Sequence, residues 1–130
     1  MNSAVNTTQA SGINDFDFFI GNWQDDNLLE MPGAAYRAAT LRSYDAEKDL
    51  WLIWWLDGRY PTQLDVPMQG RFVNSIGEFY ADDTFAGQAI RVRFYWSMPA
   101  PDQPRWEQAF SVDGGINWET NWVMDFQRIG

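Results

Sequence analysis

The C-terminal segment constrains the fold more than any other part of the chain. Residues 105–128 hold two runs of alternating large apolar and polar side chains, separated by Asp113-Gly114-Gly115. Alternation with a period of two places successive side chains on opposite faces of a strand, and an Asp-Gly pair between two such runs is typical of a hairpin turn. The segment therefore predicts a long antiparallel β-hairpin.

The side chains also predict the register of this hairpin. If 113–117 is the loop and Val112 lies opposite Trp118, then Arg105 lies opposite Asp125 and the two faces differ in polarity. A slip of one residue would place Glu119 opposite Phe110 and mix the faces, so we expect the first register. The tryptophan-rich face then holds Trp106, Gln108, Phe110, Val112, Trp118, Thr120, Trp122, Met124 and Phe126. The solvent-facing side holds Arg105, Glu107, Ala109, Ser111, Glu119, Asn121, Val123 and Asp125.

Composition excludes several classes of function. The 130 residues include no cysteine and no histidine, which excludes disulfides, thiol catalysis, zinc–thiolate and iron–sulfur sites, and histidine as a general base or as a metal or haem ligand. The formal charge of −9 repels nucleic-acid phosphates and anionic membranes, so we expect neither as a partner. The first 12 residues lack the pattern of a signal peptide and no apolar run approaches the length of a transmembrane helix, so the expected location is the cytoplasm.

The rest of the chain adds strands and almost no helix. We expect a disordered tail over residues 1–12 and a single domain over 13–130. The pattern predicts a short helical turn over 14–20 capped by Asn14 or Asp15, a first strand starting at Trp23, and a loop over 24–32. Further strands are predicted over 36–44, 50–57, 69–73, 78–80 and 90–97. Together they predict an all-β antiparallel meander of seven or eight strands that forms a partial or shortened barrel.

The strand over 50–57 is apolar on both faces, which is unusual for a sheet with one wet face. It is predicted to pair with 36–44 around a loop over 45–49, with Tyr44 opposite Leu50 and Arg37 opposite Asp57. We expect the outer face of this strand to be covered by another surface, because an exposed apolar strand favours aggregation.

Two short motifs predict structural roles. Gly21-Asn22-Trp23 looks like the G-x-W signature of lipocalins and other calycin barrels, in which the tryptophan packs beneath an arginine of the last strand. Arg128 has the parity for that partnership, as a cation–π contact. Ser111, Asp113, Gly115 and Trp118 match the Asp-box pattern S-x-D-x-G-x-x-W, in which the aspartate accepts backbone donors of a hairpin turn and the tryptophan packs beneath it. A sialidase propeller, where this box recurs, needs many blades, and this chain holds one copy.

Beyond these motifs, segments 17–23, 54–59, 70–72, 77–80, 90–94 and 105–128 resemble a bacterial family of calycin-like, lipocalin-related proteins of unknown function. That family has several further strands between the G-x-W strand and the strand matching 36–44, whereas only residues 24–35 lie there in this chain. The resemblance thus implies a barrel with a gap and two unpaired edges, which we expect a homodimer to repair. The candidate dimer contacts are Trp51, Ile53, Trp54 and Trp55.

Three functional hypotheses remain open from the sequence. The first is a binding module of calycin type for an apolar or aromatic small molecule, with no cofactor, in which Gln108 and Thr120 orient the ligand. Its candidate contacts are Trp96, Trp106, Gln108, Phe110, Thr120, Trp122 and Met124. The second is a structural or interaction protein without a pocket, completed by dimerisation. The third is a carboxylate-dependent enzyme, which is disfavoured because Glu107, Glu119 and Asp125 fall on the expected solvent face, where an ion-pair ladder is the simpler reading.

Overall fold

In the computed structural model of the protein, residues 11–19, 37–129 and the backbone of 23–29 are described. Two short 3-10 helices, η2 and η3, precede eight strands. The helices span Gly12–Asn14 and Asp17–Phe19. The strands are β1 Trp23–Leu29, β2 Ala38–Asp45, β3 Leu50–Asp57, β4 Met68–Val73, β5 Ile76–Phe85, β6 Gln88–Ala100, β7 Gln103–Ser111 and β8 Glu119–Arg128.

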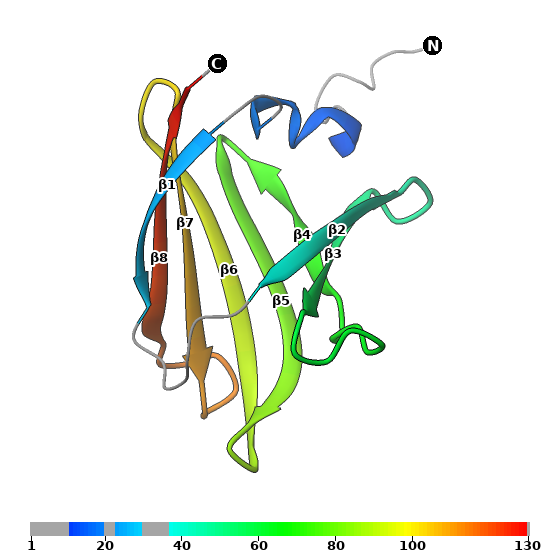
Figure 1. The fold of residues 1–130 in the computed structure, drawn as a ribbon. Helices are drawn as coiled ribbons and strands as arrows, with labels where there is room; N and C mark the ends of the chain where they lie inside the picture. The colour runs from blue at the N-terminus through cyan, green and yellow to red at the C-terminus, as the bar shows by residue number, and fades with distance from the viewer. Residues whose placement is uncertain (1–10, 20–22, 30–36, 130) are drawn as a thin grey trace.

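All eight strands belong to one antiparallel sheet in the order β1-β8-β7-β6-β5-β4-β3-β2. The sheet curls into a half-barrel, with the 3-10 helices near one end and the β7–β8 loop at the other (Figure 1). β1 and β2 are the two edge strands, and no described residue of one pairs with the other. The predicted all-β antiparallel meander of seven or eight strands is confirmed. Neither described helix has the length or apolar character needed to cross a membrane.

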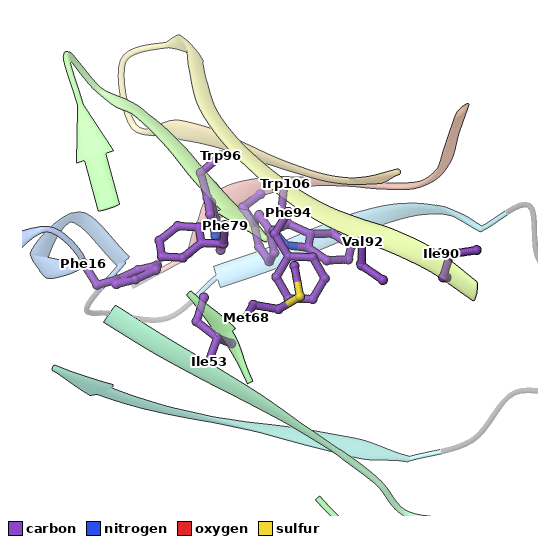
Figure 2. Close-up of a cluster of buried hydrophobic side chains, with 10 residues drawn as sticks. Phe16, Ile53, Met68, Phe79, Ile90, Val92, Phe94, Trp96 and Trp106 are labelled. Carbon is purple, nitrogen blue, oxygen red and sulfur yellow. The ribbon is translucent and has the colours of Figure 1, made fainter. Parts of the chain in front are cut away.

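The core lies on the concave face and is mostly aromatic. Alternate residues of β6 (Ile90, Val92, Phe94 and Trp96) point inward together with Phe79 of β5 and Trp106 of β7, and all six side chains are buried. Figure 2 shows them gathered opposite Ile53 and Met68, which come from the other wall of the half-barrel. Edge-to-face ring pairs such as Phe94–Trp106, with centroids 4.9 Å apart, stabilise such a core by about 0.5–1.5 kcal/mol each beyond the area they bury.

The N-terminal segment packs into one end of this core. The predicted helical turn is present as η2 and η3, but its cap is Ser11, whose side chain accepts a hydrogen bond from the Ile13 N–H. Asp15, one of the two expected caps, instead accepts hydrogen bonds from Arg71 and from the Phe72 N–H, because β4 offers a charged partner that local sequence cannot reveal. The tail predicted over 1–12 falls mostly on residues 1–10, which lie outside the described part of the chain. Ser11 and Gly12 belong to the ordered segment.

Two sequence-based expectations for the first half of the sheet are wrong. Residues 24–29, expected in a loop, continue β1, which pairs with β8 from Trp23↔Arg128 to Leu29↔Trp122. A neighbouring strand satisfies the backbone of a polar segment regardless of its composition. The β2–β3 register is shifted by one residue, so that Tyr44 faces Trp51 and Ala38 faces Asp57. Asp45 causes this shift, because its carboxylate accepts hydrogen bonds from the Glu47 and Lys48 N–H groups and thereby shortens the loop.

The β7–β8 register follows the prediction at one end and departs from it at the other. Arg105 faces Asp125 and Gln108 faces Trp122, as predicted. A register shift then places Ala109 opposite Thr120 and Phe110 opposite Glu119, which leaves Asn121 as an extra residue in β8. The slip that we expected to be disfavoured is thus present locally, as a β-bulge.

The bulge moves Trp118 to the convex face of the sheet. A bulge inserts one residue and thereby reverses which face the following side chains occupy. The Trp118 ring packs against the Arg93 guanidinium at 4.5 Å and against Tyr80 at 5.9 Å, both on the convex face. Ala109 and Ser111, predicted to face solvent, are each 1% exposed on that face. The expectation that Trp118 lies on the tryptophan-rich interior face is therefore wrong.

The β7–β8 turn is held by the Asp-box residues. The Asp113 carboxylate accepts hydrogen bonds from the N–H groups of Ile116 and Asn117 at 3.1 and 2.9 Å and from the Ser111 hydroxyl at 2.7 Å. The Ser111 oxygen accepts from the Gly115 N–H at 2.9 Å. Gly114 and Gly115 have φ values of +76° and +96°, a region that glycine occupies without strain. These donors lower the pKa of Asp113 to about 2, chiefly through the backbone hydrogen bond from Asn117.

Candidate ligand-binding site

A pocket of about 200 Å³ opens on the concave face, between the β2–β3 wall and the β6–β8 wall. Its floor comes from β6 and β7, its two sides from β2–β3 and β8, and one end from η3. The lining residues are Phe19, Thr40, Arg42, Ile53, Trp55, Phe94, Trp96, Trp106, Met124 and Phe126. Eight of these ten are large and apolar, the composition expected of a site that takes an apolar molecule.

Two aromatic contacts bridge the walls of the half-barrel next to this pocket. Trp55 of β3 meets Trp122 of β8 edge-to-face with ring centroids 5.6 Å apart. Trp122 in turn meets Trp106 at 5.2 Å in a near-perpendicular arrangement. Residues from strands far apart in the sheet order therefore touch across the concave space, although the strands themselves do not pair.

The N-terminal segment closes the other end of the pocket. Phe19 packs edge-to-face against Trp96 and Phe126, at 5.1 and 5.0 Å. Phe16 contacts Trp51 at 5.2 Å and Phe79 at 5.7 Å. These three-residue helices are too short to be stable alone, so their position depends on the contacts that they make with the sheet.

Polar contacts hold the N-terminal segment in place. Arg71 of β4 donates to Asp15 at 3.0 Å and also pairs with Asp49 in the β2–β3 loop. Asp49 accepts from the Gly12 N–H at 2.8 Å, and the Trp51 indole N–H donates to the Gly12 carbonyl at 2.6 Å. The hydrogen bond that Arg71 donates to the Asp15 carboxylate is the main cause that raises the pKa of Arg71 above its usual value. The segment is thus attached to β4 and to the β2–β3 hairpin.

Arg42 is the one charged residue among the described residues that line the pocket. It lies on β2 opposite Ile53, on the strand face that also carries Thr40. Its guanidinium carbon stacks over the rings of Phe16 and Phe19, at 4.9 and 5.6 Å from their centroids. Burial lowers the pKa of Arg42 from its ordinary value.

The residues predicted to bind a ligand are only partly brought together. Trp96, Trp106 and Met124 line the pocket. Trp122 stands beside it through its contacts with Trp55 and Trp106. The remaining three do not line it: Phe110 packs against Phe85 at 5.4 Å, Gln108 donates to the Asn121 amide oxygen at 2.9 Å, and Thr120 is exposed.

The pocket residues that sequence reasoning missed are on the opposite wall and in η3: Phe19, Thr40, Arg42, Ile53, Trp55, Phe94 and Phe126. The sequence predicts Ile53 and Trp55 to be dimer contacts, together with Trp51 and Trp54. The structure turns Trp51, Ile53 and Trp55 inward, and Ile53 is only 2% exposed. The alternation of Thr40, Arg42 and Tyr44 could have predicted Arg42 as a pocket residue. It places this cation on the face of β2 whose β3 neighbours are Trp55, Ile53 and Trp51.

The residues of the G-x-W motif are only partly described. Gly21 lies outside the described residues, and for Trp23 the backbone alone is described, opposite Arg128 in the β1–β8 register. The Arg128 guanidinium donates to the Phe18 carbonyl at 3.1 Å and lies 3.5 Å from the Asp102 carboxylate. The first contact joins the end of β8 to the N-terminal segment, and the second joins it to the turn between β6 and β7.

The carboxylates of the final hairpin lie outside the pocket. Arg105 and Asp125 form an ion pair at 2.7 Å on the convex face, which confirms their predicted pairing. Within the described ranges, no three acidic side chains are grouped so that they could hold a metal ion. Comparisons of the chain with protein-family models, with curated proteins and with solved structures find no match.

Proposed function

We propose that the protein is a small-molecule-binding module of calycin type, which takes an apolar or aromatic ligand about the size of one substituted ring into the concave pocket. The observation that carries this proposal is the pocket of about 200 Å³ with eight large apolar lining residues. An engineered apolar cavity of about 150 Å³ is sufficient to bind benzene.

The test uses toluene, phenylacetamide and phenylacetate as one-ring probes. Their binding is measured by ligand-observed NMR and by the change in tryptophan emission. We expect saturable binding of at least one probe to the wild type. Thr40→Trp adds an indole at the pocket wall and should abolish this binding. Leu41→Trp is the control: it places the same group on the opposite face of β2, where Leu41 is 59% exposed, and should leave the binding unchanged. Absence of binding by all three probes, or binding that Thr40→Trp leaves unchanged, would contradict the proposal.

A second candidate is a structural or interaction protein that self-associates. It is favoured by the two edge strands, β1 and β2, which have no described neighbour on their outer sides, and by the exposed Leu41 on β2. Exposed edges are sites where a second copy can add. In this view the interface uses the convex side of β2–β3, where Leu41 lies opposite Trp54.

Native mass spectrometry of the freshly purified protein distinguishes the two candidates. A dimer that Leu41→Lys converts into a monomer, and that Leu64→Lys leaves intact, supports the interaction candidate; Leu64 is 54% exposed and serves as the matched control. A wild type that stays monomeric at every protein concentration measured would contradict the interaction candidate. Additional small-molecule mass on either species supports the binding module.

A further inference from the structure

Arg42 is a partly buried cation without an acidic partner in the described part of the chain. Its Nε atom is buried and has no hydrogen-bond partner there. Among the described residues, its guanidinium lies over the rings of Phe16 and Phe19, and no ion pair between described residues includes it. Arginine stays protonated in proteins, so the charge persists despite its surroundings. A buried charge without a counter-ion is costly, and stacking on aromatic rings offsets only part of that cost.

A second unsatisfied donor lines the same pocket. The Nε1 atom of Trp96 is buried and has no hydrogen-bond partner among the described residues. Thr40 adds a hydroxyl to the lining. Buried donors are almost always paired in native proteins, so a guanidinium and an indole N–H on one apolar pocket indicate a ligand that supplies acceptors.

The chemistry of the lining restricts which acceptor group fits. The planar fork of a guanidinium matches a carboxylate, which can accept two parallel hydrogen bonds. A single cation neutralises a single negative charge, and none of the described lining residues is acidic, so none of them would repel the anion. A dianionic phosphate would retain an uncompensated charge in apolar surroundings. A nucleotide is much larger than a pocket of about 200 Å³.

We infer that the ligand of this pocket is a small apolar monocarboxylic acid, with its ring or short chain against Trp106, Phe94 and Met124 and its carboxylate on Arg42. This inference rests on the proposed binding function and specifies the class of ligand. The protein has a formal charge of −9, so its overall field opposes an incoming anion, and the recognition is local to Arg42.

The experiment compares phenylacetate with phenylacetamide, which have nearly the same shape and differ in charge. Isothermal titration of the full chain at neutral pH should give at least tenfold tighter binding of phenylacetate than of phenylacetamide. In Arg42→Met the phenylacetate affinity should fall at least tenfold, while the phenylacetamide affinity stays within about twofold, because methionine keeps much of the apolar packing of the arginine stem. Arg91→Met, which removes an arginine from the convex face, should change neither affinity.

The outcomes separate the two proposals. Equal affinity of the wild type for the two probes, or a preference for phenylacetate that persists in Arg42→Met, overturns the assignment of a carboxylic acid and leaves the binding function standing. Absence of binding by both probes and by toluene overturns both. A near-ultraviolet circular dichroism spectrum like that of the wild type shows that Arg42→Met is folded; if it is not, Arg42→Lys, which keeps the charge and loses the fork, should still weaken phenylacetate selectively.

Discussion

Asp113 shows how one side chain organises a turn. Its carboxylate accepts from two backbone N–H groups and from the side chains of Ser111 and Asn117. These donors favour the ionised form, which is why the pKa of Asp113 falls from 3.8 to about 2. The conformation of the turn therefore depends on a charge at residue 113.

We predict that Asp113→Asn destabilises the protein at neutral pH and that the difference from wild type disappears in acid. The folded-state pKa lies below the unfolded value, so the carboxylate contributes stability above pH 3.8, and this contribution is lost as the pH falls toward about 2. Urea unfolding at a series of pH values checks the prediction. Glu119→Gln, an exposed carboxylate of β8, is the control; a constant difference between Asp113→Asn and wild type at every pH would contradict the linkage.

A second residue-level prediction concerns the buried side chain of Phe79 in the aromatic core. Phe79 is fully buried and touches Phe16 and Phe72. Phe79→Ala should lower the free energy of unfolding by about 3–5 kcal/mol, because it removes apolar burial and leaves a cavity. Val112→Ala, at a position that is 65% exposed, should stay within about 0.5 kcal/mol of wild type in the same urea titration. A small effect of Phe79→Ala would mean that the N-terminal aromatic residues do not pack on β5.

At the scale of elements, the N-terminal segment depends on the sheet for its structure. η2 and η3 are three residues each. Phe16, between them, packs against rings of β3 and β4, and Phe19 of η3 packs against Trp96 of β6 at the end of the pocket. Arg71 is the polar centre of this attachment, with its side chain 18% exposed and that of Asp15 12% exposed. The element is therefore a part of the site, although it is remote from most of the site in sequence.

We predict that Arg71→Met loosens this segment. Loss of charged hydrogen bonds to two acidic partners should cost on the order of 2 kcal/mol in unfolding free energy and leave Asp15 without its cation. Hydrogen exchange should accelerate at the Gly12 and Phe72 amides, whose acceptors are Asp49 and Asp15. Arg91→Met breaks an exposed pair with Asp82 and should cost less than about 1 kcal/mol. Unchanged exchange at Gly12 and Phe72 in Arg71→Met would exclude the proposed attachment.

At the scale of the whole molecule, the half-barrel is held partly by contacts across its open interior. β2–β3 and β8–β1 are at opposite ends of the strand order, and the Trp55–Trp122 contact joins them without a shared hydrogen-bond ladder. The pocket lies in the space that this contact spans. The curl of the sheet and the volume of the pocket are thus linked through side chains.

We predict that Trp55→Ala destabilises the protein by about 3 kcal/mol, near the lower end for loss of a large ring from a core, because Trp55 is only partly buried. Trp54→Ala removes the same ring from the neighbouring position on the convex face and should cost about 1 kcal/mol. Urea unfolding measures both changes. Equal costs for the two variants would indicate that the contact across the interior adds nothing beyond local burial.

The class of fold and the excluded kinds of chemistry follow from the order and composition of the residues alone. The β7–β8 hairpin, the extent of β3 and the all-β meander depend mainly on residues that are neighbours along the chain. Period-two alternation and turn residues are local signals of this kind, and they therefore predict these features. The absence of histidine and cysteine needs no structure at all. Three of the seven predicted ligand contacts, Trp96, Trp106 and Met124, line the pocket, because they occupy the inward-facing positions of β6, β7 and β8.

Which side chains meet across the half-barrel depends on contacts between segments that are distant in the chain. The bulge at Asn121 reverses the face of Trp118, because packing against Arg93 outweighs simple alternation. Arg42 enters the site because curling of the sheet brings β2 opposite β8, more than 70 residues away in sequence. The attachment of Asp15 to Arg71 brings Phe16 and Phe19 over it. These contacts join segments that are distant in the chain, and their free energies depend on tertiary packing. A local sequence pattern therefore cannot predict them.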